Sequence, residues 1–221
     1  MIPNFNINLI KILNNLQNKN RFVLGLSGGL DSMALLHLLK NFINENKELK
    51  IDLIPVIVDH NLRGESKNES KEVKKISESL GFKTKIRKIT ELKPSGNIQN
   101  WARIQRRNIL FHNCVELSCN LILAQHFDDQ VETLFMRLVK ETALDGLTGM
   151  STISTWNGIS ILRPLLSYKK KQIKDYVKSK EIKYFEDPSN INFKFERVKT
   201  RYFLDSLKNK LWPNIYHDLN N

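Results

Sequence analysis

The stretch from residue 24 to residue 32 constrains the fold of this chain more than any other. An apolar run ends there in small residues, and a strongly helical segment begins at Asp31. Gly28 and Gly29 can adopt backbone dihedrals closed to other residues, and they let the backbone approach a ligand closely. Free N–H groups and the positive end of the helix dipole meet at this turn, which suits a phosphate. The competing interpretation is a plain glycine turn in which Asp31 or Ser32 caps the helix.

The length and the composition bound the domain organisation. A chain of 221 residues, 41% of them hydrophobic, suits a single α/β domain with a sizeable core. We expect that core to cover about residues 20–183 and a basic helical extension to follow over about residues 184–221. Cys114 and Cys119 have no CxxC spacing and no second pair, which argues against a zinc site or an iron–sulfur cluster. They are typical of free thiols in a reducing compartment.

The net charge points toward a polyanionic partner. It is +12, and from residue 161 to the end there are 14 Lys and Arg but 7 Asp and Glu. A basic C-terminal part favours nucleic-acid binding, although a compositional bias toward Lys, Asn and Ile is a competing explanation. Residues 2–16 lack the continuous apolar core of a secretory signal, and no run approaches the roughly 18 apolar residues of a membrane span. We therefore expect a cytoplasmic protein that does not enter membranes.

Strands and helices alternate along the chain. Apolar or alternating runs predict five strands, at residues 21–26, 53–58, 82–89, 121–124 and 159–162. Helical periodicity predicts helices at residues 2–16, 31–42, 66–80, 97–117, 128–140, 200–207 and 213–219. Ser167 caps a further, basic helix, residues 141–158 form a loop, and Pro55 lies at a sheet edge or near the start of its strand. The predicted fold is α/β, a doubly wound parallel five-stranded sheet with a small helical C-terminal extension.

Ligands of such a sheet bind at the carboxyl ends of the strands, and those ends carry the chemically loaded residues here. They are residues 27–32 after the first strand, Asp59 and His60 after the second, and residues 126–129 after the fourth. Arg103 and Arg106 lie three residues apart on one predicted helix, where they form either a clamp for a phosphate or a solvated face.

Two carboxylates, Asp129 and Glu132, stand three residues apart and share one face at the positive end of a predicted helix. Ordinary first-turn acidity would explain them, but Asp128 and His126 beside them favour a site. Paired carboxylates at this position can bind Mg²⁺ on a nucleotide or hold a cationic amine.

The residues Ser27-Gly28-Gly29-Leu30-Asp31-Ser32 resemble the SGGxDS signature of the PP-loop ATP pyrophosphatases, enzymes that cleave ATP to AMP and pyrophosphate. The stretch is not the other phosphate loop, because no Gly-Lys-Ser/Thr follows to hold a γ-phosphate for transfer. The resemblance implies that the loop grips the departing pyrophosphate while an acceptor oxygen attacks the α-phosphate and becomes adenylated.

A wider set of motifs resembles the tRNA(Ile)-lysidine synthetases, and the match runs nearly end to end. Besides the loop, the matching segments are residues 58–66 (VDHNLRGES), 102–106 (ARIQR), 124–133 (AQHFDDQVET), 145–150 (DGLTGM), 163–166 (RPLL) and 186–190 (EDPSN), followed by Arg197 and Arg201. Other PP-loop branches, such as tRNA thiolases and ammonia-dependent amidotransferases, lack the DDQxET and EDPSN elements. Thiolases also usually need catalytic cysteines.

This resemblance implies an ATP-dependent ligase that acts on the wobble cytidine of tRNA(Ile) with a CAU anticodon. ATP adenylates the C2 carbonyl oxygen, and the ε-amine of free L-lysine then displaces AMP. Activation is chemically necessary because an amide-like carbonyl oxygen is a very poor leaving group.

The resemblance also assigns roles to residues of this chain. ATP would be bound by Ser27, Gly28, Gly29, Leu30, Asp31 and Ser32, and Asp31 is the candidate ligand of Mg²⁺ on the nucleotide. The catalytic candidates are Asp31, Asp129, Glu132 and Arg103. Of these, Asp129 and Glu132 would orient the lysine ammonium and accept its proton, and Arg103 would offset phosphate charge. The substrate-binding candidates are Asp59, His60, Arg63, His126, Asp128, Arg197 and Arg201.

The chain departs from the family pattern at three places. Gln125 stands where the family usually has a first histidine, residues 140–143 (KETA) replace a usual Arg-Gly-Ser-Gly loop, and Val198 stands where an asparagine is common. Another PP-loop tRNA-modifying enzyme such as a thiolase, or a non-catalytic tRNA-binding relative, therefore stays open as an alternative. A homodimer is open as well.

Overall fold

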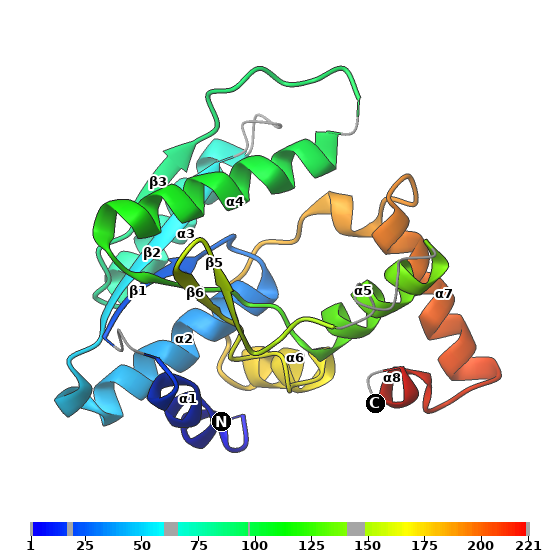
Figure 1. Ribbon diagram of the computed structural model, residues 1–221, viewed down its shortest axis with the longest axis horizontal. Helices are drawn as coiled ribbons and strands as arrows, with labels where there is room; N and C mark the ends of the chain where they lie inside the picture. The colour runs from blue at the N-terminus through cyan, green and yellow to red at the C-terminus, as the bar shows by residue number, and fades with distance from the viewer. Residues whose placement is uncertain (1, 17–19, 60–65, 97, 141–148, 220–221) are drawn as a thin grey trace.

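The fold is built around one sheet of six strands (Figure 1). The computed structural model describes residues 2–16, 20–59, 66–96, 98–140 and 149–219. The strands are β1 Arg21–Gly25, β2 Asp52–Asp59, β3 Lys85–Lys88, β4 Asn120–Ile122, β5 Ile153–Trp156 and β6 Ile159–Leu162. They lie in the order β3-β2-β1-β4-β6-β5, and every neighbouring pair is parallel except β5 with β6. The predicted doubly wound α/β architecture is confirmed.

Helices connect the strands and cover both faces of the sheet (Figure 1). The α-helices are α1 Phe5–Asn14, α2 Leu30–Glu45, α3 Ser66–Ser79, α4 Ile98–Leu117, α5 Phe127–Val139, α6 Lys170–Ser179, α7 Glu196–Lys210 and α8 Ile215–Asp218. The described residues also form short 3₁₀ helices, η1 Lys47–Leu49 and η3 Pro188–Ile191. Within the described residues, no helix combines the length and the apolar character that crossing a membrane requires.

Side chains that alternate along β1 supply two separate cores. Phe22 and Leu24 belong to the core under α1, α2, α3 and α6. Val23 packs on the other face, against Leu110 and Cys114 of α4. Successive side chains of a strand point to opposite faces, so an uninterrupted apolar run is what a strand covered on both sides requires. The sheet therefore holds the carboxyl ends of β1, β2 and β4 in fixed relative positions.

The strand count of five was wrong, because residues 153–156, expected within a loop, form the edge strand β5. It pairs with β6 in an antiparallel hairpin whose two-residue turn is Asn157-Gly158. Both turn residues have positive φ, 46° and 79°. Asn-Gly is the strongest short hairpin signal, because such a turn has a twist that matches the strands. The signal was therefore present in the sequence at this point.

Pro55 lies in an internal strand, so the sheet-edge alternative was wrong, and it is the fourth residue of β2. In β2 it stands opposite Leu24 of β1. The pairing of β2 with β3 begins one residue later, where Val56 stands opposite Lys85. Val56 O accepts a bond from Leu26 N of the β1 side, so Pro55, one residue earlier, faces the β3 side before that strand has begun. The missing N–H of the proline therefore removes no ladder bond.

The C-terminal helices begin earlier or later than their sequence signals indicated. α7 starts at Glu196 and runs to Lys210. α6 has Lys169 rather than Ser167 as its N-cap, because the preceding Leu165 and Leu166 are buried in a turn. α5, α7 and α8 share a small core of their own, formed by Val131, Leu204, Ile215 and Tyr216. The division into a core and an extension at residue 184 stays a prediction.

Candidate active site

Residues 27–32, which follow β1 and begin α2, form the centre of the site, and we call them the loop 27–32. Ser32 Oγ donates to the Gly29 carbonyl oxygen at 3.0 Å, accepts from the Ser27 N–H at 3.3 Å and lies 3.0 Å from Ser27 Oγ. The two hydroxyls thus fold the loop onto itself. Among the described residues no side chain caps α2, so the capping interpretation for Asp31 and Ser32 was wrong. The first N–H groups of the helix are left for an anion.

Gly28 is required for its dihedral angle and for its lack of a side chain. Its φ is 81°, in the left-handed region. A Cβ at this position would lie 2.5 Å from Val73 Cγ2 of α3. On the other side the Phe185 N–H donates to the Gly28 carbonyl oxygen at 2.9 Å. The loop is therefore held between α3 and the segment that follows α6.

Gly28→Ala should destabilise the protein more than Gly158→Ala. The two glycines have φ of 81° and 79°, so each alanine meets the same strain of about 1–2 kcal/mol. A Cβ at Gly158 has no atom within 4 Å, whereas at Gly28 the clash with Val73 should add roughly 1–3 kcal/mol. Urea unfolding measures both losses. The double variant Gly28→Ala/Val73→Ala should lose less free energy of unfolding than the two single variants lose together. Equal losses of free energy in Gly28→Ala and Gly158→Ala would contradict this account.

His126 joins the loop to the fourth strand end. Its Nε2 lies 3.6 Å from Asp31 Oδ2 and 3.5 Å from Asp129 Oδ2, which are ion-pair distances. Burial acts to raise the pKa of Asp31, but His126 outweighs it and the pKa lies below its usual value. Burial acts to lower the pKa of His126, but Asp31 and Asp129 outweigh it and the pKa is raised. The ring thus brings an acid of α2 and an acid of α5 to one point.

The same histidine begins α5. Its Nδ1 accepts from the Asp129 N–H at 3.2 Å, and the His126 N–H donates to Asp129 Oδ2 at 3.1 Å, which together form a capping box. In the neutral ring Nδ1 accepts this bond and the proton lies on Nε2, the atom that faces the two carboxylates. His126 is 1% exposed. In this geometry it is a positioning residue, and its contact with substrate stays a prediction.

Glu132, one turn further along α5, is enclosed by two arginines of α7. Its Oε2 accepts from Arg197 Nε at 2.7 Å, and its Oε1 accepts from Arg201 Nε at 2.6 Å. Arg197 Nη2 also donates to Asp129 Oδ1 at 3.1 Å. Glu132 is 1% exposed at its side chain and Asp129 17%. Burial acts to lower the pKa of Arg201, but Glu132 outweighs it and the pKa is raised. Arg197 and Arg201, predicted to bind substrate, thus hold the two predicted catalytic acids.

Other predicted residues lie around this centre. Asp59, buried at the end of β2, accepts from Ser66 Oγ at 3.0 Å. Asp128 Oδ2 accepts from the Lys170 N–H at 2.7 Å, which ties the start of α5 to the start of α6. Leu30 packs against the core under α2. His60 and Arg63 lie outside the described residues, as do residues 141–143.

Arg103 is exposed on α4 and makes no hydrogen bond or ion pair with another residue that the structure describes. Partial burial of the guanidinium and then the like charge of Arg197 lower its pKa, and Asp129 acts in the opposite direction. Arg103 therefore lies within reach of the charges of both Arg197 and Asp129, with its donors left for a phosphate. Its role stays a prediction.

Sequence reasoning missed three residues that shape this region. Phe185 covers the loop at Gly28, and Lys170 contributes its N–H to Asp128 and its charge to the surroundings of Asp31. Arg163 donates from Nε to Gln125 Oε1 at 2.6 Å and from Nη1 to Ser154 Oγ at 2.9 Å. The departure Gln125 therefore has a partner, which fixes the residue before His126. The motif RPLL was a usable signal for Arg163, but no local pattern indicated its partners.

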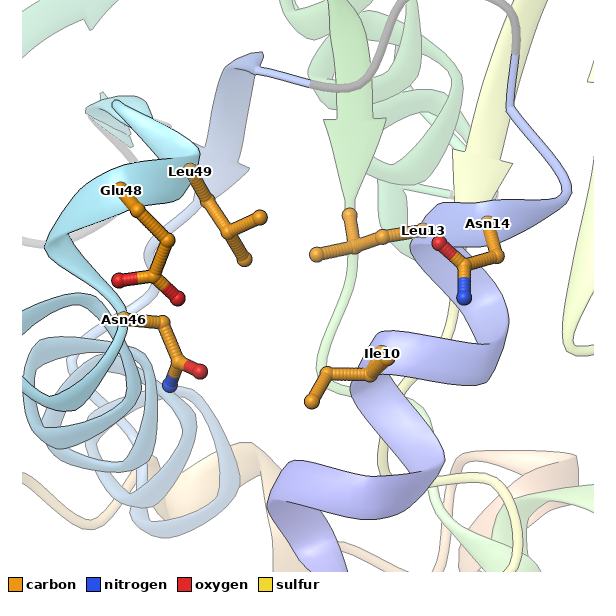
Figure 2. A pocket seen from close by; sticks show the side chains of 6 residues that line it. All are labelled: Ile10, Leu13, Asn14, Asn46, Glu48 and Leu49. Carbon is orange, nitrogen blue, oxygen red and sulfur yellow. The ribbon is translucent and has the colours of Figure 1, made fainter.

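Two cavities formed by described residues lie at the amino ends of the parallel strands, at the opposite edge of the sheet from the site. One, of about 140 Å³, lies between α1 and η1, where Leu13 and Leu49 face one another across it (Figure 2). Another, of about 320 Å³, is lined by Cys114, Cys119 and Gly158 among others. Both cysteines are buried and free. The strands begin at this edge, so neither cavity belongs to the site at their carboxyl ends.

Asp31 offers one oxygen that fits a cation. Its Oδ1 is buried and has no hydrogen-bond partner among the described residues. No group of three or more His, Cys, Asp and Glu side chains in that part of the chain is arranged to hold a metal by itself. A single carboxylate with nucleotide phosphates supplying further oxygens is the usual mode of binding for Mg²⁺, so the residues present fit that ion on a nucleotide.

The fold and the site define a nucleotide-binding α/β protein, with a glycine and serine loop at the start of the first crossover and acids from the fourth strand end beside it. The chain belongs to the PP-loop domain family, whose model matches residues 1–207. It is 37% identical over 193 residues to the tRNA(Ile)-lysidine synthase of Wolbachia pipientis wMel, a match covering 86% of this chain and 44% of that protein. The tRNA(Ile)-lysidine synthase of Rickettsia rickettsii is 35% identical over 194 residues, covering 87% of this chain and 40% of that protein. The chain thus spans less than half the length of these relatives.

Solved structures agree with the fold. A U34-tRNA thiolase, NcsA from Methanococcus maripaludis with a 4Fe-4S cluster, superposes with a TM-score of 0.79 at 20% identity, covering 99% of this chain and 77% of that one. An NAD+ synthetase from Burkholderia pseudomallei superposes with a TM-score of 0.53 at 9% identity, covering 89% of this chain and 71% of that one. Identities this low bear on the fold alone.

Proposed function

We propose that this protein ligates free L-lysine to the C2 position of the wobble cytidine in the CAU anticodon of tRNA(Ile), using ATP. The names of the curated relatives support this substrate, and the PP-loop family supports the use of ATP. The tRNA C2 oxygen would attack the α-phosphate of ATP and release pyrophosphate. The lysine ε-amine would then attack C2 and release AMP.

In this proposal the loop 27–32 holds the pyrophosphate through its backbone N–H groups and its serine hydroxyls. Asp31 Oδ1 would ligate Mg²⁺, which neutralises charge on the phosphates when it is bound. Arg103 would offset the remaining negative charge. These residues therefore serve the first, adenylating step.

Asp129 is our candidate for the group that contacts the lysine amine. Its side chain is the more exposed of the two acids, and its contact with Arg197 Nη2 at 3.1 Å is the one that an incoming ammonium would replace. Both oxygens of Glu132 already accept bonds from Arg197 and Arg201. We therefore propose that Glu132 orients the two arginines and, through Arg197, fixes Asp129.

The observation that carries the proposal is the position of His126. A single ring lies within 3.6 Å of Asp31 in the loop and of Asp129 in α5, so the acid proposed for lysine stands next to the loop proposed for ATP. Transfer between two substrates requires both to be held in contact. The short distances around His126 support a place where the proposed ATP and lysine would be held in contact.

A thiolase is the alternative that membership of the PP-loop family leaves open. It would use cysteines near the loop 27–32. Here Cys114 and Cys119 are buried at the opposite edge of the sheet, where β4 begins. The lysine ligase is therefore the better supported proposal.

One assay tests the proposal. The protein is incubated with ATP, radiolabelled lysine and bulk tRNA, and both AMP release and lysine bound to tRNA are measured. We expect tRNA-dependent AMP formation with lysine incorporated in equal amount. AMP formation that needs a sulfur donor instead of lysine would redirect the proposal to the thiolases, and tRNA binding without AMP formation would favour a non-catalytic relative.

A further inference from the structure

Helix α6 carries a row of lysines that no acid of the described residues neutralises by an ion pair. Lys170, Lys171, Lys174 and Lys178 lie within an arc of about 100° on the helix surface, and we call them the lysine stripe. None of the four forms an ion pair with another described residue. Asp175 is the only carboxylate within the helix, at one edge of the stripe. The opposite face packs into the core.

A lysine-rich composition does not by itself explain this row. Helix α3 also contains four lysines, but it carries three glutamates among them. Its Lys74 lies 3.6 Å from Glu78 and its Lys75 lies 3.3 Å from Glu72. A compositional bias toward lysine predicts the same balance of lysines and acids on both helices. The lysines of α6 are therefore offset by fewer carboxylates of their own helix than those of α3.

The stripe begins at the candidate active site. The Lys170 N–H donates to Asp128 Oδ2 at 2.7 Å, and the charge of Lys170 acts on Asp31 and His126. From Lys170 to Lys178 the stripe extends about 12 Å along the helix, at 1.5 Å per residue. Figure 1 shows α6 beside the start of α5, with its far end leading away from it. A nucleic acid bound along the stripe would thus be directed toward the site.

We propose that the lysine stripe binds the ribose-phosphate backbone of a base-paired stem of the tRNA substrate. This inference rests on the proposed function and assigns a surface to that partner. Lysine is a strongly hydrated point charge suited to phosphates, and it carries no base recognition. Proteins that bind single-stranded RNA add aromatic side chains for stacking, but the one aromatic residue of α6, Tyr176, is buried. A stem is therefore the better partner than a single strand.

The test compares two triple variants with the same change in charge. Lys171→Gln/Lys174→Gln/Lys178→Gln removes three charges of the stripe, and Lys71→Gln/Lys74→Gln/Lys75→Gln removes three from α3. Affinity for tRNA is measured at a series of KCl concentrations. Each lost phosphate contact should reduce the magnitude of the slope of log K against log salt by about 0.7–0.9. For the stripe variant we therefore expect this magnitude to fall by about two and the affinity for tRNA to fall about ten-fold. The α3 variant should keep the wild-type slope.

A kinetic readout separates this inference from the proposed function. If lysine transfer occurs, the stripe variant should raise the KM for tRNA about ten-fold and leave kcat unchanged, because the stripe does not touch the reacting atoms. If the wild type transfers no lysine, the binding slopes still test the stripe. The inference would be overturned if the stripe variant and the wild type had equal salt slopes for tRNA binding. It would also be overturned if the α3 variant lost as much of this slope as the stripe variant.

Discussion

Replacing Asp31 with asparagine should slow AMP formation by about 10²- to 10³-fold, the size of effect seen when one preorganised electrostatic group is removed from an active site. Asparagine keeps the size of the side chain and removes its charge. The lost charge faces His126 Nε2 at 3.6 Å, and the neighbouring Oδ1 is the buried oxygen available to a cation. AMP release with ATP, lysine and tRNA present measures the effect, and thermal unfolding verifies that the variant folds.

Asp52→Asn is the matched control. Asp52 is also an aspartate at a strand end, the first residue of β2, and it pairs with Arg21 at 2.9 Å, but it is exposed at the amino ends of the strands, opposite the site. Its replacement should leave AMP formation at the wild-type rate. If a folded Asp31→Asn protein forms AMP as fast as this control, the loop 27–32 has no part in the reaction.

The positions of the site elements could be predicted because they follow from local patterns. The apolar run before Ser27 predicts a buried strand, and the two glycines predict a turn. In the structure Gly28 has a φ of 81°, which few residues other than glycine adopt. The rule that ligands meet the carboxyl ends of parallel strands then brings Asp31 toward Asp129, which lie 98 residues apart in the chain. The contact between them, through His126, is the outcome of sheet order.

The partners of these residues could not be predicted in the same way. Glu132 meets Arg197 and Arg201 across 65 and 69 residues, and nothing in the local periodicity of α5 or α7 specifies that pairing. The Val73 methyl under Gly28 is likewise a product of how α3 packs. His126 differs from these residues, because its capping box with Asp129 is a local contact between residues three apart, while its contact with substrate stays a prediction.

Glu132→Ala should lower the free energy of unfolding by about 3 kcal/mol, at the lower end of the range for breaking a buried ion pair, because the guanidiniums of Arg197 and Arg201 keep some access to water. For a chain of this length that loss corresponds to a fall of roughly 10 °C in Tm. Urea and thermal unfolding measure both quantities. Glu196→Ala is the matched control, since Glu196 also joins α7 to α5, through Lys140 at 2.7 Å, but both side chains are exposed. The free energy of unfolding of Glu196→Ala should stay within about 0.5 kcal/mol of the wild-type value.

Glu132→Gln then separates a positioning role from direct contact with lysine. Glutamine keeps the shape of the side chain and an oxygen that accepts a bond from one arginine, so the variant should stay folded at the assay temperature. If Glu132 acts by fixing Asp129 through Arg197, kcat should fall while the KM for lysine changes little. A large rise in the KM for lysine at unchanged kcat would instead place the lysine amine on Glu132 itself, because it would show the loss of uniform binding to that substrate. Equal unfolding losses in Glu132→Ala and Glu196→Ala would show that the buried pair has no special weight in the contact between α5 and α7.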